Sequence, residues 1–143
     1  MKTLIAFLAV ALIATTSLFA GDFPEGSPAF EHNLTDALAK AKKDGKPVVA
    51  VFSAVWCGPC QAMKKSVYPS SEVKPFQSKF VWAYIDADEK SNAADMQKFG
   101  VSGIPHIEIL DKDGKSIGKQ VGSSSPKDFV KTLEGALKKA GGA

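Results

Sequence analysis

Two cysteines, Cys57 and Cys60, are the only cysteines of the chain, and they enclose the dipeptide Gly58-Pro59. The reactive form of cysteine is the thiolate, but a free thiol has a pKa near ~8.5 and is mostly protonated at neutral pH. Cys57 follows an apolar run of strand length and opens a stretch that suits a helix. Backbone N–H groups and the positive end of the helix dipole should therefore face its sulfur and lower its pKa to about 7 or below.

The second cysteine lies one helical turn later, so it should point back toward Cys57 and be more buried. Such a dithiol can reduce a disulfide in two steps. Cys57 forms a mixed disulfide with the substrate, and Cys60 resolves it, which leaves a Cys57–Cys60 bridge. Pro59 suits the first turn of a helix because its missing N–H is not needed there, and Trp56 should shield one side of the pair. The motif predicts thiol–disulfide exchange.

Other uses of a closely spaced cysteine pair fit less well. A purely structural bridge across so short a loop removes little unfolded-state entropy. A zinc site needs about four ligands, and His32 and His106 are the only histidines that could join the cysteines. Covalent haem attachment requires a histidine directly after the second cysteine, where Gln61 stands. We therefore expect no metal and no cofactor beyond the Cys57–Cys60 disulfide.

The composition describes one ordinary domain. The chain has 143 residues, of which 45% are hydrophobic and 23% charged, which is enough to form a core. Its formal charge is only +3, and all 18 basic residues are lysines spread along the sequence. Nucleic-acid binding usually needs a dense basic patch rich in arginine. We expect a monomer without a nucleic-acid partner.

Residues 1–20 have the pattern of an export signal. Met1-Lys2 is a short positive region, an apolar run follows from Leu4 to Ala14, and Ala20 is the most suitable cleavage position. An uncleaved membrane anchor is the alternative, although this stretch is short for a spanning helix and contains a Thr-Thr-Ser cluster. Both interpretations place the domain outside the cytoplasm, and we expect it in the periplasm.

The mature chain alternates helical and strand patterns. Residues 21–32 are rich in proline and glycine and predict an irregular lead-in, and the domain should cover 33–140. Helices are expected over 34–44 with Asn33 or Thr35 as cap, over 60–67, from Ser70 or Ser71 to Phe80, over 93–99 and from 126; strands are expected over 48–52, 80–85, 104–110 and 116–121.

The strand patterns differ in kind. Residues 48–52 are continuously apolar, which predicts a strand buried on both faces, whereas 104–110 alternates like a strand with one exposed face. Strands separated by helices should be parallel, and the turn 111–114 should close an antiparallel hairpin. Ser125, Pro126 and Asp128 have the spacing of a capped helix start. The order of elements indicates one α/β domain.

The sequence resembles the thioredoxin family over most of the mature chain. Residues 46–60 are similar to the family's central strand and active-site turn, and Gly103-Ile104-Pro105 to the loop whose proline is cis and lies against the cysteines. Gly114 and Gly122 also occupy positions where the family has glycines. The resemblance implies a thioredoxin fold, a central mixed sheet with a C-terminal antiparallel hairpin flanked by helices. It also implies that Ile104 and Pro105 bind the substrate strand.

Three positions depart from the family pattern. The family commonly buries an acid six residues before the first cysteine, where this chain has Val51, and a lysine neighbour where this chain has Trp82. Proton transfer to or from Cys60 should therefore use water or another group, with Glu108 and His106 as candidates. Gln61 also replaces the basic residue that often follows the motif.

His106 has two interpretations. It can be a solvated loop residue beside Pro105, or its imidazole can lie near the sulfurs and stabilise the Cys57 thiolate below pH ~6.5. His32 has no comparable context. Trp82 and Tyr84 are expected to be core or sheet-face residues.

Taken together, these features predict an exported thiol–disulfide oxidoreductase. The Gly58-Pro59 pair resembles the reducing members of the family, so we expect a reductase of protein disulfides that a membrane thiol reductase recharges with electrons. The alternatives are a disulfide oxidase or isomerase, and a non-catalytic peptide-binding or chaperone module that uses the Pro105 loop.

Overall fold

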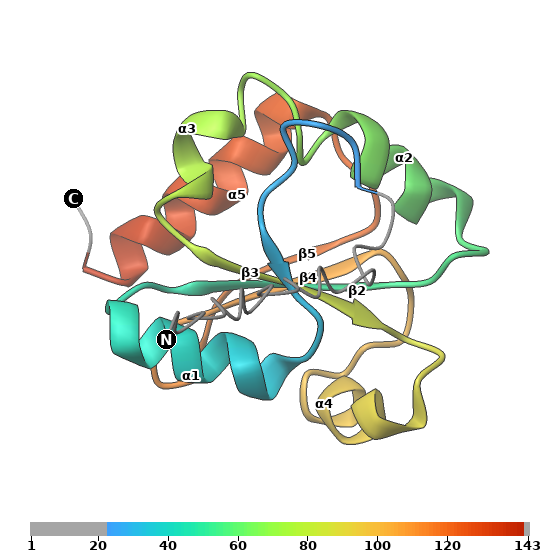
Figure 1. Ribbon diagram of the computed structural model, residues 1–143, viewed down its shortest axis with the longest axis horizontal. Coiled ribbons are helices and arrows are strands. Elements are labelled where there is room, and N and C mark those ends of the chain that lie inside the picture. The colour runs from blue at the N-terminus through green and yellow to red at the C-terminus, as the bar shows by residue number, and fades with distance from the viewer. Residues whose placement is uncertain (1–22, 142–143) are drawn as a thin grey trace, which may run out of the picture.

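The computed structural model describes residues 23–141 as a five-stranded sheet with helices on both faces (Figure 1). The strands, in the spatial order β1-β3-β2-β4-β5, are β1 (Phe30–Glu31), β3 (Val81–Asp86), β2 (Val48–Ser53), β4 (His106–Leu110) and β5 (Ser116–Val121). The helices are α1 (Leu34–Asp44), α2 (Gly58–Ser66), α3 (Lys74–Gln77), α4 (Ala93–Lys98) and α5 (Pro126–Lys139), with a 3₁₀ turn η1 (Lys90–Asn92) before α4. None of the helices in this part of the chain has the length and apolar composition needed to cross a membrane.

The sheet is mixed. β2 pairs in parallel with β3, as expected for strands joined through a helical crossover, and β4 and β5 form the antiparallel hairpin. The expectation that strands separated by helices are parallel is wrong for β4, which pairs antiparallel with β2. β3 ends with Asp86 opposite Ser53, and β4 begins with His106 opposite Phe52. The intervening segment, which includes the short α4, therefore starts and finishes at the same end of the strands. As a result, β4 runs antiparallel to β2.

Two apolar cores lie on the two faces of β2. Val49 and Val51 face the core under α2 and α5, and the alternating residues Val48, Ala50 and Phe52 face the core under α1 and α4. Figure 1 shows these helix pairs above and below the sheet. Every residue of β2 is buried, as the continuous apolar run predicts. The strand that leads into Cys57 is thus rigidly held from both sides.

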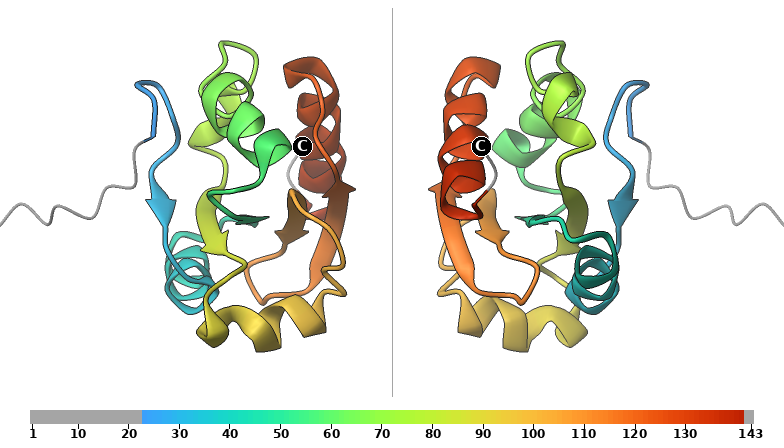
Figure 2. Two further views of the ribbon diagram at one scale, coloured as in Figure 1. Left: turned by 90° about the vertical axis from the view of Figure 1, so that its right-hand side faces the viewer. Right: turned by 90° about the vertical axis from the view of Figure 1, so that its left-hand side faces the viewer.

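The lead-in contains an additional strand. Residues 21–32 are expected to be irregular, but Phe30 and Glu31 form β1 and pair in parallel with Trp82 and Ala83 of β3. The Phe30 ring packs edge-on against Trp82, at 5.9 Å between ring centroids. Figure 2 shows the segment passing along the outer edge of β3. Its pairing depends on an aromatic contact from a distant strand, which local sequence patterns do not reveal.

Two further expectations need correction. The helix expected from Ser70 or Ser71 to Phe80 is only α3, because Pro75 lacks an amide hydrogen and can stand only in the first turn of a helix. The Ser70 hydroxyl accepts a hydrogen bond from the Val73 amide at 3.4 Å in the turn before α3, and it donates to the Val67 carbonyl at 2.7 Å. The strand expected to have one exposed face, β4, is buried along its whole length because Ile107 and Ile109 pack in the core under α2 and α5, and Leu110 packs in the core under α1 and α4.

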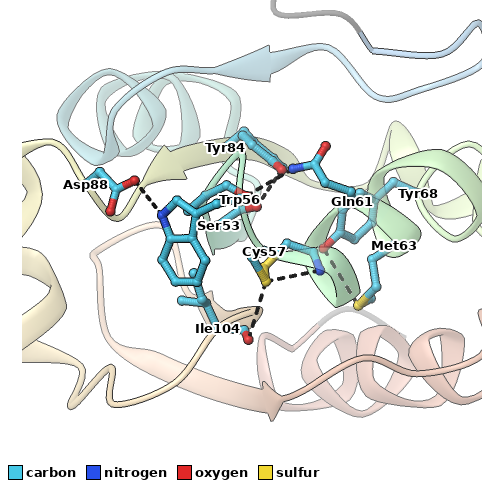
Figure 3. Close-up of a disulfide and its surroundings, with 11 residues drawn as sticks. Ser53, Trp56, Cys57, Gln61, Met63, Tyr68, Tyr84, Asp88 and Ile104 are labelled. Atoms are coloured by element: carbon cyan, nitrogen blue, oxygen red, sulfur yellow. Dashed lines mark hydrogen bonds between the residues drawn. A yellow bond between two sulfur atoms is a disulfide. The ribbon is translucent and has the colours of Figure 1, made fainter.

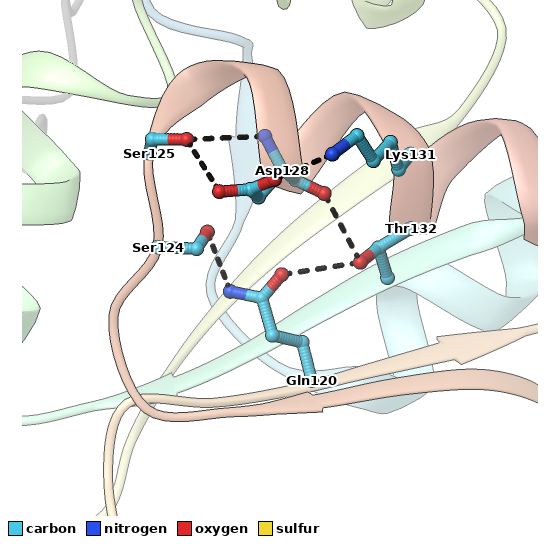
Figure 4. Close-up of polar contacts among 6 residues, drawn as sticks. All are labelled: Gln120, Ser124, Ser125, Asp128, Lys131 and Thr132. Carbon is cyan, nitrogen blue, oxygen red and sulfur yellow. Dashed lines mark hydrogen bonds and ion pairs between the residues drawn. The ribbon is translucent and has the colours of Figure 1, made fainter.

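The capping predictions are confirmed. The Asp36 amide donates to the Asn33 side chain at 2.8 Å, and Gly45 ends α1 in the left-handed conformation, with φ 67°. At α5 the Asp128 amide donates to the Ser125 hydroxyl at 3.2 Å, and that hydroxyl donates to the Asp128 carboxylate at 2.8 Å (Figure 4). A hydrogen bond of 3.2 Å from the Thr132 hydroxyl to Gln120 ties the same helix to β5.

Replacing Ser125 with alanine is expected to cost about 1 kcal/mol of unfolding free energy, because it removes the acceptor for a first-turn amide of α5. Urea denaturation followed by circular dichroism measures this loss. Ser123→Ala, two residues earlier in the same loop, is the control and should change the midpoint little. Equal losses in the two variants would contradict the capping role of Ser125.

Candidate active site

The two cysteines lie where β2 gives way to α2. Cys57 is the N-cap of α2, and its sulfur accepts a hydrogen bond from the Cys60 amide at 3.3 Å. The cysteines form a disulfide, with their Cα atoms 5.2 Å apart. Pro59 stands in the first turn of the helix. Cys57 is 5% exposed and Cys60 1%, so Cys60 is the more buried residue, as expected from the sequence.

The loop before β4 comes to the disulfide, as the resemblance implies. The Ile104–Pro105 peptide bond is cis. The Ile104 carbonyl oxygen lies 3.7 Å from the Cys57 sulfur, and Ile104 packs on the small cluster of Ala54 and the two cysteines (Figure 3). The Gly122 amide donates to the Pro105 carbonyl at 2.8 Å and so joins the loop to the end of β5. Residues far apart in the sequence thus border one sulfur atom.

The turn before Cys57 projects into solvent. The side chain of Val55 is 82% exposed and that of Trp56 68%. The Trp56 indole N–H donates to the Asp88 carboxylate at 2.7 Å, and Figure 3 shows the indole on the Asp88 side of Cys57. Trp56 therefore lies beside the pair, as expected, and its orientation is fixed by an acid after β3 that the sequence analysis did not single out.

The two positions at which the family commonly has a buried acid and a lysine lie in the apolar core of this protein. Val51 and Trp82 are both buried in the core under α2 and α5. The Trp82 indole N–H donates to the Gln77 carbonyl at 3.1 Å, which confirms its interpretation as a core residue. No charged group thus occupies either position, and proton exchange with Cys60 must use another route.

His106 is neither a solvated loop residue nor a neighbour of the sulfurs under α2. It begins β4, is buried, and packs its ring against Phe52 on the face covered by α1 and α4. Its Nε2 pairs with the buried Glu108 carboxylate at 2.8 Å. The Ser116 hydroxyl also donates to that carboxylate, and Lys119 Nζ lies 3.9 Å from it. Side-chain alternation along β4 directs this pair away from the face on which α2 lies. Glu108 links β4 to β5 through Ser116 and Lys119.

A polar cluster of Ser53, Tyr84 and Gln61 lies beside α2, and the sequence analysis did not predict it. The buried Ser53 hydroxyl and the Tyr84 hydroxyl are 2.5 Å apart. Burial raises the pKa of Tyr84, and hydrogen bonds with Ser53 and Gln61 oppose that rise. The Gln61 amide also donates to the Ala54 carbonyl at 3.0 Å. A serine at the end of an otherwise apolar strand, on the same face as Val51, was the signal available in the sequence.

Within residues 23–141, no group of His, Cys, Asp and Glu side chains is placed to hold a metal ion. The chemistry offered by the geometry is that of the sulfur pair itself.

Comparison with known families agrees with this site. A family model described as a thioredoxin-like domain matches residues 34–137. The chain belongs to this family. The architecture is accordingly the thioredoxin fold, and the Cys57–Cys60 disulfide is the redox-active pair typical of thioredoxins. The match begins at α1, so β1 and the lead-in lie outside it.

The relatives include a plant protein and a bacterial protein. The chain is 31% identical over 116 residues to the chloroplastic thioredoxin-like protein HCF164 of Arabidopsis thaliana, with 80% of this chain and 44% of that protein covered. It is 34% identical over 113 residues to the thiol:disulfide interchange protein DsbD of Pseudoalteromonas atlantica, with 74% and 19% covered. The chain thus spans less than half the length of either protein.

Among solved structures, a thioredoxin from Thermus thermophilus superposes with a TM-score of 0.72 at 26% identity, with 80% of this chain and 91% of that chain covered. This similarity in structure agrees with the fold assigned from the family model.

Proposed function

We propose that this thioredoxin-like protein is an exported thiol–disulfide oxidoreductase that reduces disulfides of protein clients. The observation that carries the proposal is the asymmetry of the cysteine pair. Cys57 caps the N-terminus of α2 beside the exposed Trp56 and the Ile104 carbonyl, whereas Cys60 is buried behind it. One sulfur is thus placed to meet a substrate and the other to resolve the adduct.

The proposed reaction conserves atoms and electrons. In the dithiol form, the Cys57 thiolate attacks one sulfur of a client disulfide, and the other client sulfur leaves as a thiolate. The Cys60 sulfur, after losing its proton, then attacks Cys57 and releases the second client thiolate. The client gains two electrons, and the protein keeps the Cys57–Cys60 disulfide. The backbone at Ile104 and Pro105 would hold the client strand during both steps.

The reducing direction is supported by the Gly58-Pro59 dipeptide. Thioredoxin-type pairs have potentials near ~−270 mV, whereas strongly oxidising pairs lie near ~−120 mV. A reductant outside the cytoplasm must be recharged, and we propose a membrane thiol reductase as its electron donor. The similarity to DsbD supports a partner with thiol chemistry. The export signal itself falls in residues 1–20, outside the described residues.

Equilibration with glutathione tests the direction. A potential below about −230 mV is expected for a reductase, and a value above about −150 mV would favour the oxidase or isomerase. Replacing both cysteines with serine separates an enzyme from a peptide-binding module, because only the module would keep its activity.

Replacing Cys60 with serine is expected to trap the protein on its clients. Cys57 can still attack, but without the resolving sulfur the mixed disulfide persists. Non-reducing electrophoresis and mass spectrometry of the exported fraction would show adducts that disappear with reductant and identify both clients and donor. Cys57→Ser is the matched control and should form far fewer adducts, since the remaining Cys60 sulfur neither caps the N-terminus of α2 nor lies beside the Ile104 carbonyl. Equal adducts from the two variants would contradict the assigned order of attack.

A further inference from the structure

Few contacts hold the turn that carries the reactive sulfur. Its two central side chains, Val55 and Trp56, are mostly exposed and contribute little packing. The Cys57 amide donates to the Ala54 carbonyl at 3.2 Å and closes the turn. The indole bond to Asp88 holds the tip from one side. The precise position of the Cys57 sulfur therefore depends on a small number of hydrogen bonds.

Gln61 supplies one of these bonds from the helix. Its side-chain amide donates to the same Ala54 carbonyl oxygen, at 3.0 Å, and thus connects the first turn of α2 with the end of β2. Ala54 is buried, so its carbonyl has these protein donors in place of bulk water. Two N–H groups, the backbone amide of Cys57 and the side-chain amide of Gln61, thus converge on one oxygen atom. Figure 3 shows Gln61 on the side of Cys57 opposite Asp88.

The Gln61 side chain is itself held in place. The Tyr84 hydroxyl lies 2.5 Å from the Ser53 hydroxyl, and the neighbouring Gln61 side chain opposes the rise of the Tyr84 pKa that burial causes. The Phe23 ring packs edge-on against Tyr84, at 5.0 Å between centroids, and Lys64 Nζ lies 4.4 Å from the centre of the Phe23 ring. The lead-in therefore covers the hydroxyl cluster on its outer side. A hydrogen bond shielded from water is stronger than an exposed one.

We propose that Gln61, oriented by the Tyr84 and Ser53 hydroxyls, is a positioning residue that sets the reactivity of Cys57 through the Ala54 carbonyl. The proposal rests on the thiol–disulfide chemistry proposed above. The Cys57 sulfur accepts the Cys60 amide at 3.3 Å at the N-terminus of α2. That stabilisation of a thiolate depends on the distance and direction of the amide, which the turn controls. Gln61 acts without a net charge, where the family often has a basic residue.

The test uses alkylation of Cys57 in a Cys60→Ser background, so that a single thiol reacts. The rate of reaction with iodoacetamide against pH reports the pKa of Cys57 and requires no client. Gln61→Met keeps the approximate shape and removes the donor. We expect the pKa of Cys57 to rise toward that of a free thiol, so that the alkylation rate at pH 6.5 falls about three- to tenfold.

Two more variants make the result specific. Tyr84→Phe keeps the ring and removes only the hydroxyl, so it should shift the profile in the same direction by a smaller amount. The double variant should equal Gln61→Met alone, because the two residues act in series. Gln120→Met is the matched control. It removes the side-chain hydrogen bonds of Gln120 to Gly122, Ser124 and Thr132, none of which involves α2 or the Ala54 turn, and should lower the melting temperature without moving the pH profile.

The proposal is overturned if Gln61→Met and the parent have alkylation rates within twofold at pH 6.5, or if Gln120→Met shifts the profile equally. If Gln61→Met does not fold, an unchanged profile in Tyr84→Phe overturns it also. A parent protein whose Cys57 titrates like a free thiol would instead contradict the proposed function. The two failures are therefore distinguishable.

Discussion

Replacing Val51 with aspartate is expected to destabilise the fold by about 4 kcal/mol or more at pH 7, since burial without a charged partner raises a carboxyl pKa by about three units. Val51 is fully buried under α2, and the position of the family's lysine is occupied by Trp82, which cannot pair with an acid. The folded state would therefore favour the neutral acid. Stability should be greatest below the unfolded pKa of about 3.9 and fall as the pH rises toward the folded pKa.

Urea denaturation of Val51→Asp at pH 4 and pH 7 measures this dependence. Val51→Asn is the matched control, because it places a polar group of the same size at the same site and does not titrate. We expect the asparagine variant to lose similar stability at both pH values and the aspartate variant to lose far more at pH 7. Parallel losses in the two variants would show that water or a cation reaches this position, and would reveal a route for protons toward Cys60.

Replacing Phe129 with alanine is expected to cost about 3–5 kcal/mol, the range for removing a buried aromatic ring. Phe129 is fully buried and is the main anchor of α5 in the core. Its ring centroid lies 5.6 Å from that of Tyr68 and 6.2 Å from that of Trp82. Removing the ring leaves a cavity between three helices and the sheet that these large, rigid neighbours cannot readily fill.

The same denaturation experiment measures the loss. Val130→Ala, on the adjacent and only partly buried position of α5, is the control and should lose about 1 kcal/mol. A loss below about 1.5 kcal/mol for Phe129→Ala would mean that Tyr68 and Trp82 move into the space, and that the aromatic cluster is more plastic than its packing indicates.

Much of the fold follows from local patterns. The buried β2, the caps at Asn33 and Ser125, and the turn that closes the β4–β5 hairpin all have short-range signals, and the structure agrees with them. The errors concern contacts between segments distant in the sequence. In β1, Phe30 packs on Trp82 and Tyr84 of β3, and both faces of β4 are buried because its alternating side chains enter the two cores.

In the candidate site also, features with local motifs are predicted correctly and contacts between distant segments are not. The cysteine pair and the cis-proline loop are recognisable from their motifs. His106 was misplaced because the sequence does not tell which face of a strand a residue occupies until the register is known, and here the register directs it toward Phe52 and Glu108. The contacts of Gln61, Ser53 and Tyr84 join three elements and leave no motif.

The pairing of β1 with β3 has a consequence for how the domain is delimited. The family match begins at Leu34, but the sheet includes β1 before it, and a chain cut at Leu34 would leave the backbone of β3 as an open edge. It would also uncover the rings of Trp82 and Tyr84, which Phe30 now packs against. For truncation, fusion or domain exchange, the lead-in from Phe23 onward should therefore be kept with the domain.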